Sequence, residues 1–293
     1  MPVVSYLQVA LAAIGWGTWS LILRPAGVDP RWAAALMLAV VSVVGAPLLI
    51  PRAARPTGMR TPRDGWAMVA IGVFDAANAG LFFAAMAKTT VAVAVLSHYL
   101  APLFVAVAAP RALGTRPLPG SIPLSLVALV GLALVLDPLK GLSGSTVVGA
   151  LLGAGSAVFY AANVLITKRL GPKFSAEELL VYHAVLSAGI LAVVALATGA
   201  PTPPLAGVVR ISIAAAVIGA GAGLLFLYGL RHVPAEHASM LTFLEPLTAV
   251  VVARIAFGER PSRTALVGAA IVLAAGAFAV HASRSTSRQE PSI

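Results

Sequence analysis

The sequence has 293 residues, of which 59% are hydrophobic and only 10% are charged, and its mean hydropathy is +0.95. A soluble domain carries roughly 25% charged residues, so the composition excludes an ordinary soluble protein and predicts an all-α integral membrane protein. The absence of cysteine excludes a disulfide framework and any thiolate metal or redox site.

Ten apolar runs follow one another along the chain, each long enough to cross a bilayer as a helix. They cover residues 3–23, 32–50, 65–87, 91–110, 121–137, 146–167, 179–198, 209–230, 236–257 and 264–281. The weakest separations lie at 88–90 and at 231–236. Residues 283–293 are polar and rich in serine, and they predict a disordered cytoplasmic tail.

The positive charges predict the orientation of these helices. A net charge of +10 would suggest a nucleic-acid partner in a soluble protein, but in a membrane protein Lys and Arg mark the cytoplasmic loops. If the N-terminus is cytoplasmic, twelve of the 20 Lys and Arg residues fall on the inner side, most densely in residues 51–64. We therefore predict no nucleic-acid partner, a cytoplasmic (inner) membrane location and two cytoplasmic termini.

The two halves of the chain repeat one another. A shift of 144 residues places Ala101-Pro102-Leu103 on Glu245-Pro246-Leu247 and Arg116-Pro117 on Arg260-Pro261. The repeat unit therefore contains five spans, and an odd number of spans forces the two copies into opposite orientations. The sequence predicts two inverted five-helix repeats, 1–144 and 145–282, an arrangement that is typical of secondary transporters.

The second repeat resembles a known family. Residues 235–257 read AEHASMLTFLEPLTAVVVARIAF, and GERPS and VGAAIVLAAG follow them. This pattern is similar to the second EamA repeat of the drug/metabolite transporter superfamily, and residues 91–135 resemble a weaker first copy. Thr115 stands where the second copy has Glu259, a departure of the first repeat from the pattern. The resemblance implies ten spans, transport of amino acids, nucleosides or drugs, and a cavity lined mainly by spans 1, 3, 4, 6, 8 and 9.

The third span carries a polar stripe. Asp75 and Asn78 are three residues apart, and Phe82 continues the same helical face one turn later. A polar or ionisable side chain inside a membrane is costly and is usually functional. Because the equivalent residues of the second half are Gly219, Ala222 and Phe226, we expect this stripe to face the substrate; a structural hydrogen bond between helices is the alternative.

The fourth and ninth spans carry ionisable groups beside prolines. His98 and Tyr99 precede Pro102, whose missing N–H frees a carbonyl group one turn earlier, and Glu245 precedes Pro246 at the equivalent place. His98 could bind the substrate, accept a proton or join two helices by a hydrogen bond. We regard Asp75, Glu245 and His98 as candidates for proton coupling.

Aromatic and amide side chains share a face in the first and sixth spans. The 144-residue shift places Trp16 on Tyr160 and Trp19 on Asn163, and such rings suit a flat or amphipathic solute; an interfacial aromatic belt is the alternative. We interpret Tyr182 and His183 as interfacial, and Glu236 and His237 as part of a solvated loop. The small-residue pairs Gly149/Gly153 and Gly219/Gly223 predict close helix packing.

Together these features predict a secondary transporter with alternating access that exports a small polar or zwitterionic metabolite such as an amino acid. Export of nucleosides or amphipathic cationic drugs is the alternative, and a lipid flippase or an intramembrane enzyme is the alternative of another class. Catalytic motifs, a P-loop and paired metal ligands are absent from the sequence, so we expect no enzyme activity, cofactor or metal. The expected partners are the bilayer and a small-molecule substrate, which is bound by Trp16, Trp19, Asp75, Asn78, Phe82, His98, Tyr99, Tyr160, Asn163, Phe243 and Glu245.

Overall fold

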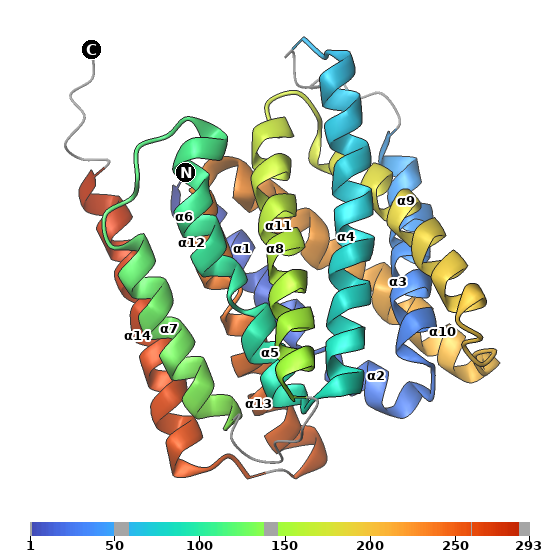
Figure 1. Ribbon diagram of the computed structural model, residues 1–293. Helices are drawn as coiled ribbons and strands as arrows, with labels where there is room; N and C mark the ends of the chain where they lie inside the picture. Colours follow the sequence, from blue (N-terminus) through green and yellow to red (C-terminus); the bar gives the residue numbers. More distant parts are fainter. Residues whose placement is uncertain (1, 50–58, 138–145, 259, 287–293) are drawn as a thin grey trace.

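Helices make up almost all of the computed structural model, which describes residues 2–49, 59–137, 146–258 and 260–286 (Figure 1). No strand occurs in these ranges. The helices are α1 (Pro2–Gly17), α2 (Ser20–Ala26), α3 (Pro30–Gly45), η1 (Ala46–Leu49), α4 (Pro62–Lys88), α5 (Val91–His98), α6 (Ala101–Leu113), α7 (Ser121–Leu136), α8 (Thr146–Leu170), α9 (Ala176–Ala197), α10 (Leu205–Ala214), η2 (Ala215–Gly219), α11 (Ala220–His232), α12 (Ala235–Leu241), α13 (Leu244–Phe257) and α14 (Arg263–Thr286).

These helices form the ten spans that the sequence predicts. In the described part of the chain, eight helical stretches are long and apolar enough to cross a membrane, and α7 and α14 add two shorter apolar helices. The all-α membrane fold is thereby confirmed. Helix α14 continues to Thr286, so the first residues of the predicted tail are helical. The rest of that tail, residues 287–293, lies outside the described residues.

Three spans are broken in their interior, whereas the hydropathy pattern predicts one continuous helix for each of them. The first span divides between α1 and α2, the fourth between α5 and α6, and the ninth between α12 and α13. Proline explains the last two breaks, because Pro102 and Pro246 lie in the first turns of α6 and α13 and lack the N–H that would continue the helix. The eighth span stays continuous but contains the π-helical turn η2.

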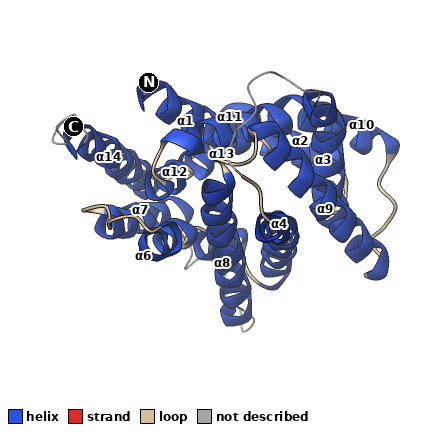
Figure 2. Ribbon diagram, turned by 90° about the horizontal axis from the view of Figure 1, so that it is seen from above, coloured by secondary structure: helices blue, strands red, loops and turns tan. Residues whose placement is uncertain are grey.

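The most extensive helix contacts join the two halves of the chain. Helix α3 packs on α9, α4 on α8, α1 on α11 and α7 on α14 (Figure 2). The second and seventh spans, and the fifth and tenth, are partners that exchange places under the repeat. The contact between the third and sixth spans exchanges with the equivalent contact between the eighth and first spans. This is the arrangement expected when two inverted five-helix repeats share a two-fold axis in the membrane plane.

Glycines permit the close contacts between these helices, as the small-residue pattern predicts. A Cβ atom at Gly153 on α8 would lie 2.7 Å from the Ser97 Cβ of α5, and one at Gly223 on α11 would lie 2.8 Å from the Leu180 Cδ1 of α9. Gly153 requires glycine because the Ala94 carbonyl oxygen of the α5 backbone would also lie 3.0 Å from its Cβ, whereas the flexible Leu180 side chain could move away from a Cβ at Gly223. Close backbone approach between helices replaces the hydrophobic driving force that is absent in lipid.

The contact between α7 and α14 provides a test of this packing. A Cβ at Gly268 would collide with the Gly131 carbonyl oxygen and lie 2.8 Å from the Leu134 Cβ. We therefore expect Gly268→Ala to lower the free energy of unfolding by about 1–3 kcal/mol, as overpacking does. Gly276→Ala on the same helix is the matched control, because no atom lies within 4 Å of its added Cβ. Thermal unfolding in detergent measures both, and equal unfolding temperatures for the two variants would contradict this view of the interface.

Charged side chains form ion pairs at both ends of the bundle. The beginning of α1, the end of α14 and the beginning of α4 lie at the same end (Figure 1), where Arg60 donates to both carboxylate oxygens of the buried Glu178, at 2.7 and 2.9 Å. At the opposite end, Asp29 caps α3 and pairs with Arg31 at 2.8 Å. The Arg31 guanidinium holds the pKa of the Asp29 carboxyl below its usual value.

Candidate functional site

The interrupted helices place polar groups in the interior of the bundle. Helix α5 ends at His98, and α12 ends just before the turn that contains Thr242 and Phe243. Because Pro246 has no N–H, the Thr242 carbonyl accepts instead from the Glu245 N–H at 2.9 Å, and the Tyr99 hydroxyl also donates to it at 3.3 Å. This second hydrogen bond joins the two helix breaks in one site.

A chain of hydrogen bonds connects three helices at this site. The Ser156 hydroxyl on α8 donates to the Asn78 Oδ1 on α4 at 2.7 Å. The His98 Nδ1 lies 2.9 Å from the same hydroxyl oxygen. Because the hydroxyl proton is directed to Asn78, His98 must donate through Nδ1, and its Nε2 then carries a lone pair. This arrangement shows the hydrogen bond between helices that is the alternative for the third-span stripe and for His98, and contact of Asn78 with a substrate stays a prediction.

Aromatic rings surround His98. Phe82, Tyr99 and Tyr160 place their ring centroids 5.0, 5.5 and 5.4 Å from that of the imidazole. Phe243 extends the group, because its ring centroid lies 5.4 Å from that of Tyr99. His98 is half-buried among these rings, and its hydrogen bond to Ser156 is made through Nδ1.

The Glu245 carboxyl belongs to this group. It interacts with the Tyr99 hydroxyl and is close enough to Tyr160 to act on it electrostatically. Asp75 also acts electrostatically on Tyr160, so two of the predicted coupling candidates affect the same hydroxyl.

Asp75 has a second ionisable neighbour that the sequence analysis placed elsewhere. The His183 Nε2 lies 3.9 Å from the Asp75 Oδ2, and their side chains are 20% and 23% exposed. The interfacial interpretation of His183 is therefore wrong: α9 begins at Ala176, three residues before the predicted start, so His183 lies two turns inside the span. Tyr182 points away from this site and is 43% exposed.

The broken first span lies against the same site. Trp16 packs on Phe226 of α11 with ring centroids 5.3 Å apart, and a Cβ at Gly219 would lie 3.7 Å from the Trp19 Cζ2. Gly17 lies between the two tryptophans, and a Cβ there would lie 2.5 Å from the Glu245 carbonyl oxygen. The π-turn η2 ends at Gly219, the position that corresponds to Asp75 in the first repeat, and π-turns occur frequently at functional sites.

Asn163 has a buried polar atom without a hydrogen-bond partner in the described structure. Its Oδ1 is inaccessible to solvent, and it lies on α8 one turn beyond Tyr160. A buried acceptor that nothing satisfies costs about 1–3 kcal/mol. An ordered water or a solute that reached this atom would remove that cost.

Some buried polar residues were not predicted from the sequence. Ser156 lies four residues before Tyr160 on the same helical face, and that spacing could have identified it. Glu236 and His237 are buried rather than solvated, with 3% and 4% exposure, and the His237 Nδ1 lies 2.8 Å from the Tyr6 hydroxyl oxygen. Within the described ranges, no three His, Asp or Glu side chains are grouped to hold a metal ion.

The chain is similar to known proteins both in sequence and in fold. The sequence matches the model of the EamA-like transporter family over residues 3–137 and again over residues 147–280. An uncharacterized transporter of Archaeoglobus fulgidus is 28% identical over 272 residues, which cover 91% of this chain and 92% of that protein. A solved crystal structure matches with a TM-score of 0.80 and 21% identity, covering 94% of this chain and 97% of that one, and it shares the fold.

Proposed function

Because this chain belongs to the EamA-like transporter family, whose members are membrane transporters rather than enzymes, we propose that it is a secondary transporter with alternating access that exports a small zwitterionic metabolite such as an amino acid. The observation that carries this proposal is the environment of Asp75. Its partly exposed carboxyl group lies at the centre of the third span, beside His183. A carboxylate at this depth needs a water-filled space or a cationic partner.

The groups around Asp75 suit the two ends of a zwitterion. The carboxylate would pair with the solute ammonium group. Helix α6 begins at Ala101 inside the membrane, and its first turn contains no acidic residue, so the positive end of its dipole would suit the solute carboxylate. The unsatisfied Asn163 Oδ1 would accept a further hydrogen bond from the solute.

The walls of the site suit a small solute with an apolar part. Tyr99, Tyr160 and Phe243 contribute rings, and the Trp16–Phe226 pair closes the side that faces α11. None of the rings requires a solute of one particular shape, so they would tolerate several amino-acid side chains. Lys and Arg side chains take no part in the contacts described for this group, which disfavours a multiply charged anion.

The helix breaks support alternating access. The fourth and ninth spans each divide at equivalent places beside a proline, and the first span divides at Gly17. Short helices that meet inside the membrane can tilt separately, while the paired α7 and α14 provide a fixed support. Two inverted repeats that exchange their conformations would open the site first to one side of the membrane and then to the other.

The orientation that we propose keeps both termini in the cytoplasm. The beginning of α1 and the end of α14 share one end of the bundle with the beginning of α4 (Figure 1). Arg60 and Lys173 form ion pairs beside the beginning of α4, and basic residues concentrate on the cytoplasmic side. A location in the cytoplasmic (inner) membrane, together with proton coupling through Asp75, Glu245 or His98, would allow the proton gradient to drive export.

Uptake into proteoliposomes tests the proposal directly. We expect the purified wild-type protein to accumulate at least one labelled amino acid from a panel, and protein-free liposomes to accumulate none. Failure with every amino acid would contradict the zwitterion proposal. Uptake of a nucleoside or a cationic drug instead would keep transport but change the solute, and movement of labelled lipid between leaflets would indicate a flippase.

A further inference from the structure

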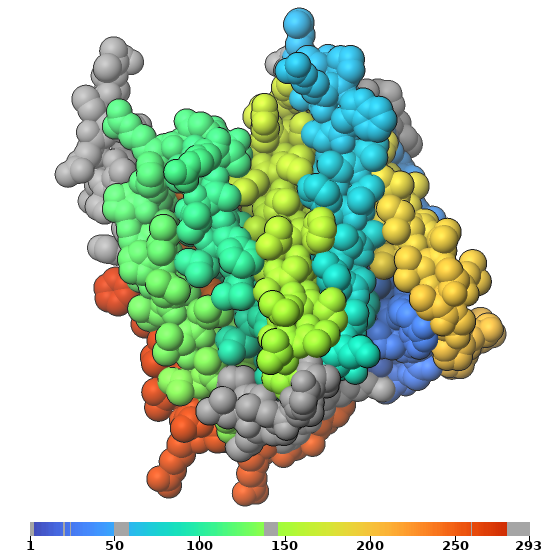
Figure 3. Space-filling view, viewed as in Figure 1, coloured from blue at the N-terminus to red at the C-terminus, as the bar shows by residue number. Residues whose placement is uncertain are grey.

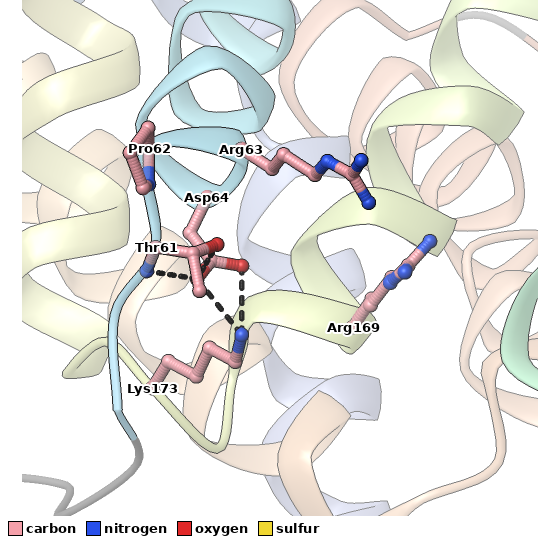
Figure 4. Close-up of a pocket in the computed structure, with 6 residues that line it drawn as sticks. All are labelled: Thr61, Pro62, Arg63, Asp64, Arg169 and Lys173. Carbon is pink, nitrogen blue, oxygen red and sulfur yellow. Dashed lines mark hydrogen bonds and ion pairs between the residues drawn. The ribbon is translucent and has the colours of Figure 1, made fainter.

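A pocket of about 550 Å³ lies far from the proposed transport site, at the end of the bundle where α4 begins (Figure 4). Its lining residues come from the start of α4 and from the end of α8 with the turn that follows it: Thr61, Pro62, Arg63, Asp64, Arg169 and Lys173. Its volume falls within the range of small-molecule sites. None of these residues takes part in the Asp75–His98–Glu245 group.

The pocket carries an excess of positive charge. Three of its residues are cationic and one is acidic, so its formal charge is +2. Lys173 donates to the two Asp64 oxygens at 2.8 and 2.9 Å, and Asp64 also caps α4 through Thr61. That carboxylate is therefore fully engaged. Arg63 and Arg169 account for the remaining charge.

The two guanidinium groups extend from different helices toward the same space. Figure 4 shows Arg63 reaching from α4 and Arg169 from the end of α8, both on the side away from the Asp64–Lys173 pair. Neither makes a hydrogen bond or an ion pair with any described residue. Two planar guanidinium groups that converge in this way match the oxygens of a phosphate group.

An apolar strip continues from the pocket along α4. Trp66 follows Arg63 by three residues, and Val69 and Val73 follow at helical spacing, so the four lie on one side of the helix. Trp66, Val69 and Val73 are 73%, 43% and 41% exposed. Tryptophan is typical of the membrane interface, and the valines below it would face acyl chains.

From this arrangement we propose that the Arg63–Arg169 pocket binds the phosphate headgroup of an anionic phospholipid, whose acyl chains lie along the Trp66–Val73 strip. The cationic pocket accounts for the phosphate, and the adjoining strip accounts for the chains. A free phosphate or a nucleotide would use the pocket alone, and the lining contains no aromatic ring on which a base could stack. Basic pockets at the cytoplasmic ends of helices bind such headgroups.

Lipid-dependent thermal unfolding tests the site without any transport assay. Purified protein in detergent is titrated with phosphatidylglycerol, with phosphatidylcholine of the same acyl chains, or with inorganic phosphate, and the unfolding temperature is followed. We expect phosphatidylglycerol to raise it and the other two to have little effect. In the Arg63→Gln/Arg169→Gln variant the midpoint of the phosphatidylglycerol titration should rise about 30-fold, since each arginine near an anionic surface contributes about fivefold.

The control removes two arginines at the opposite end of the bundle. Arg260→Gln/Arg263→Gln takes away the same charge from exposed positions and should leave the midpoint unchanged. An equal effect of both double variants would overturn the proposal, because it would show a response to net charge alone. Stabilisation by phosphate alone would assign the pocket to a free anion and overturn the lipid assignment.

If the variant does not fold, native mass spectrometry of the wild-type protein tests the same proposal. Retention of phosphatidylcholine as strongly as phosphatidylglycerol would overturn the lipid assignment.

Discussion

Asp75→Asn is expected to lower amino-acid uptake into proteoliposomes at least tenfold. The substitution keeps the size of the side chain and its capacity to accept a hydrogen bond, but it removes the negative charge that would face the solute ammonium group. A hydrogen bond to a charged group contributes about 1.5–3 kcal/mol, which corresponds to roughly 10-fold to 100-fold in binding. The measurement is the initial rate of uptake of the solute that the wild type transports, at several solute concentrations.

Asp29→Asn is the matched control for this prediction. Asp29 caps α3 outside the proposed site, and asparagine is an equally good helix cap, so uptake should remain close to that of the wild type. His183→Gln should have an intermediate effect, because His183 lies 3.9 Å from Asp75 and influences the solute only through it. Unchanged uptake by a well-folded Asp75→Asn protein would assign Asp75 to helix packing and remove the main support for a zwitterionic solute.

The span pattern could be predicted from the sequence because it follows from hydrophobicity alone. Ten apolar runs and a 144-residue repeat require neither contacts nor distances, and they correspond to the helices and to the pairing of α3 with α9. The Asp75–Asn78–Phe82 stripe could also be predicted, because three residues on one helix face follow from helical spacing. What each of these side chains contacts could not be predicted in the same way.

The helix breaks and the second histidine depended on information beyond a single helix. A proline in an apolar run can bend a helix, end it or be tolerated within it, so Pro102 and Pro246 did not by themselves indicate the breaks at 99–100 and 242–243. The position of His183 required the true start of α9, which the Ser175–Glu178 capping box sets earlier than the hydropathy pattern does. Glu177 and Glu178 lower the hydropathy of the first turn of α9, so the hydropathy pattern predicts a loop there.

The two repeats differ most at the level of the candidate site. Asp75 lies on a continuous helix, whereas the equivalent Gly219 ends a π-turn; conversely, the first span is broken at Gly17, whereas the equivalent α8 is continuous. Identical repeats would bind a solute symmetrically. Instead, one carboxyl group, Asp75, lies in the first repeat and the other, Glu245, in the second, and both act electrostatically on Tyr160.

This separation suggests different roles for the two acids, and Glu245→Gln tests the second. Under the proposal, Asp75 binds the solute and Glu245 exchanges the coupled proton with the two sides of the membrane. An amide cannot release or bind that proton, so we expect Glu245→Gln to abolish accumulation driven by a pH gradient. One pH unit supplies about 1.36 kcal/mol per proton, enough for about tenfold accumulation of a neutral zwitterion; in the variant the ratio of inside to outside concentration should fall to about one.

Exchange at equal pH separates loss of coupling from loss of folding or binding. When labelled solute outside exchanges with unlabelled solute inside, no net proton movement is needed, so Glu245→Gln should keep a rate within about threefold of the wild type if the loss is confined to the titrating group. Asp75→Asn should instead fail in both assays, because it removes the binding contact itself. If accumulation by Glu245→Gln still follows the pH gradient, Glu245 is excluded as the coupling residue. Asp75 and His98 then remain as candidates: Asp75 acts electrostatically on Tyr160, and the His98 ring contacts the Tyr160 ring.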